Sequence, residues 1–422
     1  MENTIETTAL SGISSILHIN EKGGRFGGTE EYIASLAKIV APMGISSHLL
    51  YDGVHGSMAS GIFHREIKGL GNRNGDRELG DRILRAVEEI DPDIVYVHNI
   101  FDGRVMESLD KPGRNYLIIW YIHDHFPTCL TELRATREEA NIICDRALSQ
   151  ACLSNIESGL CVKRHQDRTF SEKDLSARLD LLGSLRNADA IVVVSNYMKR
   201  VLSKNLPGIE DKTYFLPRQV RESQVESDRE NNQSPVIVFS GRITEEKGLH
   251  LAIEALGKLQ VEGEILFKIA GVVETESYWQ RCLKLAENVK RENPAIKIEY
   301  QGHLSYQEVD ALYAEADLVV VPSIWGEPLG AVAAEAMRNG AAVVASNVGG
   351  IDTWVIPEET GFLVKPDVDS LAEAIARLLS DSDLRDRLAT TGQTLIKTQF
   401  TAKEHIKVLS EVIRDCRSLS PS

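Results

Sequence analysis

Short apolar runs alternate with amphipathic stretches through the first 220 residues. The runs are ISSILHIN (13–20), SSHLLYDG (46–53), IVYVHN (94–99), YLIIWYIHD (116–124) and the middle of LLGSLRNADAIVVVSNYMKRVL (181–202). Between them, TEEYIASLAKIVAPMG (29–44) and RELGDRILRAVEEIDPD (77–93) have helical periodicity. Strands without a polar face, separated by helices, indicate a parallel sheet that is covered on both sides.

The same rhythm restarts after a polar stretch, RESQVESDRENNQS (221–234), which we interpret as a linker. Predicted strands are PVIVFSG (235–241), ILFKIAG (265–271), IKIEYQG (296–302), ADLVVVPS (316–323) and AAVVASN (341–347). Predicted helices include LHLAIEALGKL (249–259), DSLAEAIARLLSD (369–381) and TAKEHIKVLSEVIRDCRSL (401–419). The pattern therefore predicts an α/β protein with two Rossmann-like doubly wound domains, covering 1–220 and 235–398.

Two such domains place their ligands at the carboxyl ends of their strands, so we expect them to face each other across a ligand-binding cleft. Residues 126–180 interrupt the alternation with a charged segment that has no predicted strand. An insertion of that length at a strand end is expected to serve function, and with loop 55–80 it is where we expect acceptor choice to reside.

Composition narrows the function classes. The chain of 422 residues carries a net charge of −15, which argues against nucleic acid as a partner. No apolar stretch approaches the length of a membrane span, and the N-terminus lacks the features of a secretion signal. We therefore expect a cytoplasmic protein, with peripheral contact to the inner membrane face left open.

Four of the six cysteines, Cys129, Cys144, Cys152 and Cys161, crowd into the insertion, but their spacing matches no common zinc pattern. We interpret them as free thiols, with a structural metal or a redox pair as the alternative.

Candidate chemistry gathers where strands end. FSGRITEEKG (239–248) places Arg242 and Lys247 on one loop, where two cations could hold a diphosphate, although a solvated charged loop would have the same composition. GGRFGGTEEY (23–32) offers Gly27 and Gly28 for a close approach to phosphate at a helix start, or a plain turn. WYIHDHFP (120–127) ends a strand with His123, either a packed histidine or one that binds sugar or shuttles a proton; His98 is a weaker candidate.

The stretch SIWGEPLGAVAAEAMRNGAAVVASNVGG (323–350) carries Glu327 and Glu335. Pro328 predicts a helix that begins there, with Glu327 at its mouth and Glu335 about two turns further on. Carboxylates accept paired hydrogen bonds from vicinal diols, so these two suit a sugar and a ribose. Two solvent-facing glutamates are the alternative, which the apolar neighbours of Glu335 oppose.

Taken together, these motifs resemble glycosyltransferase family 4. The resemblance rests on the order GGTE, HD, GRITEEKG, PSIWGEPLGAVAAEAM, ASNVGG and TGFLV. It implies a retaining transferase of GT-B fold that uses a nucleotide-sugar donor without a metal or other cofactor, and a final helix (399–418) that crosses back to the first domain. UDP is favoured over GDP, and the acceptor is a hydroxyl of a glycan, lipid-linked or small-molecule partner. The family often has Asn-Gly after the proline that closes the first domain, where this chain has Arg218 and Gln219.

By the same resemblance, Arg242 and Lys247 neutralise the donor diphosphate, together with Gly27, Gly28 and the backbone N–H groups of Leu329 and Gly330. Glu327 and His123 contact the transferred sugar, and Glu335 holds the ribose. Three alternatives stay open: a nucleotide-sugar epimerase, a phosphorylase, and an inactive subunit that only binds the nucleotide sugar. An epimerase needs further acid–base carboxylates and a phosphorylase needs a pyridoxal lysine, and neither stands out in the sequence.

Overall fold

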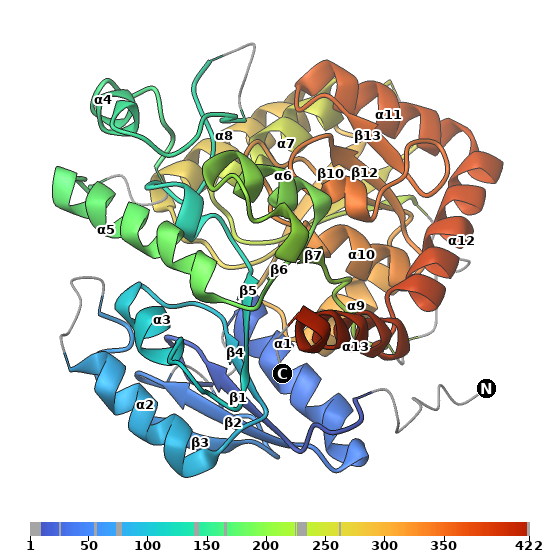
Figure 1. Ribbon diagram of the computed structural model, residues 1–422. Coiled ribbons are helices and arrows are strands. Elements are labelled where there is room, and N and C mark those ends of the chain that lie inside the picture. Colours follow the sequence, from blue (N-terminus) through green and yellow to red (C-terminus); the bar gives the residue numbers. More distant parts are fainter. Residues whose placement is uncertain are drawn as a thin grey trace. The chain divides into compact units, whose positions relative to one another are not determined.

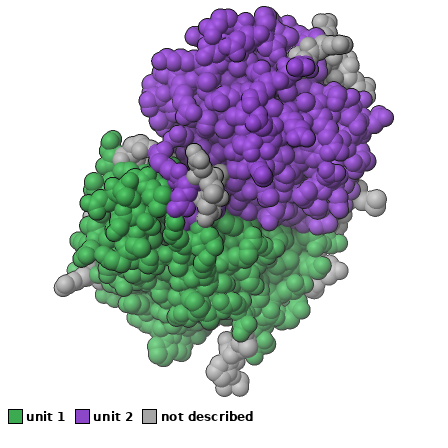
Figure 2. Space-filling view, turned by 90° about the horizontal axis from the view of Figure 1, so that it is seen from above, with its two compact units in different colours: residues 1–132, 145–218, 402–422 green, residues 133–144, 219–401 purple. Residues whose placement is uncertain are grey.

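The computed structural model describes residues 10–24, 27–54, 57–72, 78–138, 143–163, 167–223, 225, 234–260 and 263–419. Most of the predicted linker lies outside the described residues, as do parts of the predicted acceptor loops. The chain forms two compact units, coloured separately in Figure 2. Unit 1 comprises 1–132, 145–218 and 402–422, and unit 2 comprises 133–144 and 219–401.

Unit 1 is built on a parallel sheet of seven strands in the order β3-β2-β1-β4-β5-β6-β7 (Figure 1). Its strands are β1 (Ser15–Ile19), β2 (Ser46–Tyr51), β3 (Phe63–Glu66), β4 (Ile94–Val97), β5 (Leu117–Ile122), β6 (Ala190–Val193) and β7 (Thr213–Phe215). Its helices are α1 (Gly28–Val40), α2 (Leu79–Ile90), α3 (Arg104–Leu109), α4 (Ala151–Glu157), α5 (Glu172–Ser184), α6 (Asn196–Asn205) and α13 (Ala402–Leu419). Every residue of β1, β4 and β6 is buried, which explains why β4 and β6 are unbroken apolar runs and why β1 is apolar except at Ser15 and His18.

Unit 2 repeats the plan with six parallel strands in the order β10-β9-β8-β11-β12-β13. The strands are β8 (Val236–Ser240), β9 (Ile265–Ala270), β10 (Ile296–Gly302), β11 (Leu318–Val321), β12 (Ala342–Ser346) and β13 (Phe362–Val364). The helices are α7 (Leu249–Gly257), α8 (Glu276–Glu292), α9 (Tyr306–Glu315), α10 (Ala331–Arg338), α11 (Val368–Ser380) and α12 (Ser382–Gln399).

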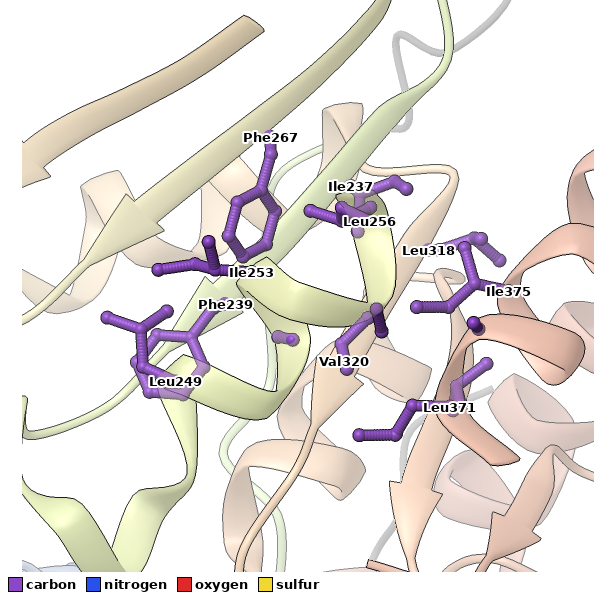
Figure 3. Close-up of a cluster of buried hydrophobic side chains, with 14 of the residues drawn as sticks. Ile237, Phe239, Leu249, Ile253, Leu256, Phe267, Leu318, Val320, Leu371 and Ile375 are labelled. Atoms are coloured by element: carbon purple, nitrogen blue, oxygen red, sulfur yellow. The ribbon is translucent and has the colours of Figure 1, made fainter. Parts of the chain in front are cut away.

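The core of unit 2 fixes the start of α7. Figure 3 shows Leu249, Ile253 and Leu256 of this helix among side chains of the sheet, including Phe239 and Phe267. All five are at most 2% exposed. Because Leu249 is anchored here, the loop that precedes it, with Lys247, has a fixed end.

The expectation of two Rossmann-like doubly wound α/β domains is confirmed, with differences in detail. Contacts place residues 133–144, inside the 126–180 insertion, in unit 2 rather than in the first domain, and unit 1 includes the chain from 402 onward. The prediction that a helix starts at Pro328 is wrong. Gly330 precedes α10 with φ of 70°, and the helix begins at Ala331, so Glu327 lies in the loop before it.

Candidate active site

Two loops of unit 2 meet where its strand order reverses. The first loop follows β8 and contains Lys247; the second follows β11 and contains Glu327. Strands β8 and β11 are neighbours, whereas the chain continues from β8 to β9 on the other side. A doubly wound sheet leaves a crevice at such a switch point, beyond the carboxyl ends of its strands.

Glu327 is the centre of a buried polar cluster. Its Oε2 atom accepts hydrogen bonds from Lys247 Nζ at 2.7 Å, Trp325 Nε1 at 2.8 Å and Ser323 Oγ at 3.2 Å. Only 7% of Glu327 is exposed, and the ammonium also lies 5.2 Å from the centre of the Trp325 ring. The charged and polar donors around this carboxylate replace the hydration that it loses on burial.

Glycines hold the Glu327 backbone in place. Gly350 donates its N–H to the Glu327 carbonyl at 2.7 Å. Gly349 has φ of 63°, and a Cβ atom there would lie 2.0 Å from that carbonyl oxygen. Gly248, next to Lys247, has φ of 71° and would bring a Cβ atom 1.9 Å from the Pro322 carbonyl. Both glycines thus allow a backbone approach that no other residue could make.

Arg242 is placed differently from Lys247. Its guanidinium pairs with Glu274 at 2.8 Å and lies 3.5 Å from Glu246, which is 6% exposed. The two predicted cations therefore share a loop, but only Lys247 bonds to Glu327 in this structure. Glu274, after β9, has no place in the sequence motifs and was missed.

Donor groups precede α10. Within the described part of the chain, the backbone N–H groups of Leu329 and Gly330 donate to no protein acceptor, while the Leu329 carbonyl accepts from Trp354 Nε1 at 2.7 Å. Glu335 lies on α10 and is partly buried, as its apolar neighbours suggested. Its charge contributes to the raised pKa of Tyr313, which results mainly from burial of that phenol.

The predicted glycine turn lies in unit 1, although Arg25 and Phe26 of the turn fall outside the described residues. The N–H of Gly27 donates to the Glu30 carboxylate at 2.9 Å, so this group is already used. Gly28 is the first residue of α1, and a Cβ atom there would lie 3.3 Å from the Arg218 guanidinium. Arg218 thus lies beside the glycine turn, at the position where the sequence departs from the resemblance.

His123 follows β5 and is partly buried. Its Nε2 atom lies 2.9 Å from Nδ1 of His98, whose Nε2 lies 3.0 Å from Nδ1 of His18. Burial, aided by the positive charge of Arg218, lowers the pKa of His123 to about 3. His98 was noted in the sequence, but His18 was missed. The available signal was a histidine near the end of each of three apolar strands.

Among the described residues, neither a structural metal site nor a redox pair of cysteines finds support in the insertion. None of the six cysteines, all of which lie in the described part, forms a disulfide; four of them are partly buried, and Cys282 and Cys416 are buried. No group of three or more histidine, cysteine, aspartate or glutamate side chains that could hold a metal ion occurs within the described ranges.

Ser323 and Trp325, the partners of Glu327, were also missed, since nothing in the sequence indicates that both donate to one carboxylate.

None of the helices in the described part of the chain combines the length and apolarity needed to cross a membrane.

Two family models match adjacent parts of the chain: Glycosyltransferase Family 4 at residues 26–222 and Glycosyl transferases group 1 at residues 220–395. The uncharacterized glycosyltransferase MJ1607 of Methanocaldococcus jannaschii is 32% identical over 179 residues, which is 41% of this chain and 44% of that protein. The alignment thus spans less than half of this relative.

Solved structures agree on the fold. Sucrose-phosphate synthase of Thermosynechococcus elongatus superposes with a TM-score of 0.69 and 20% identity, covering 96% of this chain and all of the other. HepE of Anabaena, in complex with UDP-glucose, gives a TM-score of 0.65 and 18% identity, with 96% and 100% covered. These similarities and the two parallel sheets define a GT-B fold. With the two family models side by side over residues 26–395, the chain belongs to glycosyltransferase family 4, the group 1 glycosyltransferases.

Proposed function

We propose that the protein is a retaining glycosyltransferase that moves a hexose from a nucleotide sugar, preferably a UDP-sugar, to an acceptor hydroxyl. The observation that carries the proposal is the Lys247–Glu327 pair, 2.7 Å long and enclosed at the switch point of unit 2. A partly buried ammonium beside a buried carboxylate is suited to a ligand that has both a diphosphate and sugar hydroxyls. The UDP-glucose bound by HepE supports the choice of base and sugar.

In the proposed reaction, the bond between the anomeric carbon and the diphosphate oxygen breaks, and its electron pair leaves with the diphosphate. The acceptor oxygen forms the new bond on the same face, and its proton passes to the departing phosphate oxygen. Lys247 and Arg242 stabilise the negative charge that develops on the leaving group. The N–H groups of Leu329 and Gly330, which have no protein acceptor in the described part, are proposed to donate to the same diphosphate.

Glu327 is proposed to hold sugar hydroxyls. Its second carboxylate oxygen, Oε1, has no described protein donor, whereas Oε2 is held by three. Glu335 is proposed to accept from the ribose diol, and His123 to contact a sugar hydroxyl. The protein is proposed to act without a metal, because two cationic side chains can compensate the diphosphate charge.

Nucleotide release tests this proposal. Purified protein is mixed with UDP-glucose or GDP-mannose and a panel of hydroxyl acceptors, and free UDP or GDP is measured with and without EDTA. We expect UDP release that EDTA does not reduce, and a sugar product with the anomeric configuration of the donor. Loss of activity with EDTA would contradict the metal-free reaction, and no release from any donor would favour a subunit that only binds.

Variants locate the chemistry. Lys247→Met and Arg242→Ala are each expected to lower turnover about 100-fold, since one lost contact to developing charge costs several kcal/mol. Lys268→Met is the matched control: Lys268 also forms a 2.7 Å ion pair and is 17% exposed against 18% for Lys247, but its partner is Glu315 on α9. An equal loss of turnover in Lys268→Met and Lys247→Met would contradict the role proposed for Lys247 at the leaving group.

A further inference from the structure

Three histidines form a hydrogen-bonded row across three neighbouring strands of unit 1. His18 is in β1, His98 follows β4 and His123 follows β5, and these strands are adjacent in the sheet. The rings of His18 and His98 are 5.3 Å apart, and those of His98 and His123 are 5.2 Å apart. Trp120 Nε1 donates to the His98 carbonyl at 2.9 Å and so holds the backbone of the middle member.

The two ends of the row differ. His18 is 0% exposed, and its Nε2 atom is buried with no hydrogen-bond partner. At the other end, His123 is partly exposed, and its Nδ1 atom is neither enclosed nor bonded to any group in the described ranges. The row therefore has a closed end inside the sheet and an open end at the strand termini.

All three imidazoles are neutral at neutral pH. Burial lowers the pKa of His18 to about 3, and that of His123 also to about 3 with the help of Arg218. The pKa of His98 is held well below its ordinary value, first by burial and then by the two flanking histidines. The other rings packed on the row are the phenols of Tyr32, Tyr96 and Tyr121, whose raised pKa values keep them neutral too.

A neutral imidazole has one N–H and one bare nitrogen, so the row can carry its protons in only two ways. In the first, every proton is on Nε2; His123 then donates inward, and the row ends with a buried N–H of His18 that has no acceptor. In the second, every proton is on Nδ1; His18 donates to His98, His98 donates to His123, and the atom left without a partner is the bare Nε2 of His18. Buried N–H groups without an acceptor are rarer than unfilled acceptors, which favours the second arrangement.

We propose that His18 and His98 are positioning residues, which hold His123 as a neutral imidazole with its proton on Nδ1, so that it offers a hydrogen-bond donor at its open end. His123 is then not a general base, because the nitrogen that would accept a proton is occupied by His98. The row is also no proton conduit, since it ends at a buried atom. For the proposed sugar transfer, on which this reading of His123 rests, the expected contact is an N–H donated to a sugar oxygen.

Nitrogen-15 NMR of histidine-labelled full-length protein reads the tautomers directly and needs no substrate. Signals of the three residues are assigned from the single variants His18→Phe, His98→Phe and His123→Phe. We expect the wild-type protein to show protonated Nδ1 and bare Nε2 at all three, the opposite of the form that imidazole prefers in water. Protonated Nε2 at His98 or His123 would overturn the proposal, and His98→Asn supplies the His98 assignment if His98→Phe does not fold.

Two substitutions at one position separate positioning from packing. In His98→Asn, the amide nitrogen is as many bonds from Cα as Nδ1 and can still donate to His123; in His98→Phe, no donor remains. We expect His98→Asn to keep the Nδ1 proton on His123 and near wild-type kcat. In His98→Phe, His123 should no longer be held in a single tautomer. The kcat should fall about tenfold, which is the effect of one hydrogen bond. Equal kcat in both variants would refute the role of His98. Nδ1-protonated histidines in a protein that turns over no donor would instead count against the proposed function alone.

Discussion

The Lys247–Glu327 pair should show strong energetic coupling in a double-mutant cycle. The perturbations are Lys247→Met, Glu327→Gln and the two together. At 2.7 Å, two unit charges attract by about 6 kcal/mol for an effective dielectric constant of about 20, before the cost of desolvation is subtracted. The side chains are 18% and 9% exposed, so little solvent screens them.

Removing one partner of a buried pair typically lowers stability by about 3–5 kcal/mol, because the other charge is left without compensation. Trp325 and Ser323 still donate to Glu327 after Lys247 is lost, and the amide oxygen in Glu327→Gln can still accept from Lys247. We therefore expect the lower end, about 3 kcal/mol, for each single variant. The double variant leaves no unpaired charge. It should therefore be more stable than the sum of the singles predicts by about 2 kcal/mol.

The assay is urea unfolding followed by tryptophan fluorescence. Of the four tryptophans, Trp279, Trp325 and Trp354 belong to unit 2, so the signal reports mainly on that unit. A parallel cycle on Lys268 and Glu315 serves as control, because that pair has the same length but a carboxylate that is 33% exposed. Its coupling should be below about 1 kcal/mol. Coupling as small in the Lys247–Glu327 cycle would refute our account of the buried site.

Three further outcomes are expected. Gly349→Ala should lower the stability of unit 2 by about 3 kcal/mol, because the alanine would be strained in the left-handed conformation and would clash with the Glu327 backbone. Gly302→Ala, with φ of 75° and no atom within 4 Å of its Cβ, should lower it by only about 1 kcal/mol. Equal losses in urea unfolding would refute the clash. Arg218→Gln should raise the pKa of His123, because a nearby positive charge is removed, and an unchanged value in an NMR titration would contradict that placement. His18 and His123 alone should lower the stability by about 2.5 kcal/mol from about pH 7 to about pH 5.5, since in the unfolded chain they bind protons below the ordinary histidine pKa, whereas in the folded protein they do not until about pH 3; urea midpoints that do not move with pH would exclude this linkage.

The sequence predicted the parts of the fold that local pattern determines. Strands buried on both faces are continuous apolar runs, and Arg242 and Lys247 could be assigned to the loop after such a strand. Strand β3 was not predicted, because three of its four residues are exposed and its sequence, FHRE, has no apolar run. Short edge strands of this kind are defined by their neighbour and not by their own composition.

Tertiary contacts explain the remaining differences. Proline favours the first position of a helix, so Pro328 was a sound local signal. However, Gly330 adopts a left-handed conformation with Ile351 packed where its Cβ would be, and this delays α10 to Ala331. The role of His18 could not be predicted either, because it depends on β1 and β4 being adjacent, and strand order follows from the whole sheet.

The segment 133–144 has a consequence for how the polypeptide can be divided. The Leu133 carbonyl accepts the N–H of Gly326, one residue before Glu327, and Ala135 forms a bridge with Ile143 within the same unit. If the gene were cut at the polar stretch near residue 225, the C-terminal product would lack residues 133–144, which belong to its own unit. The N-terminal product would lack α13. A ribosome makes that helix after all of unit 2, so unit 1 can finish folding only once unit 2 has been translated.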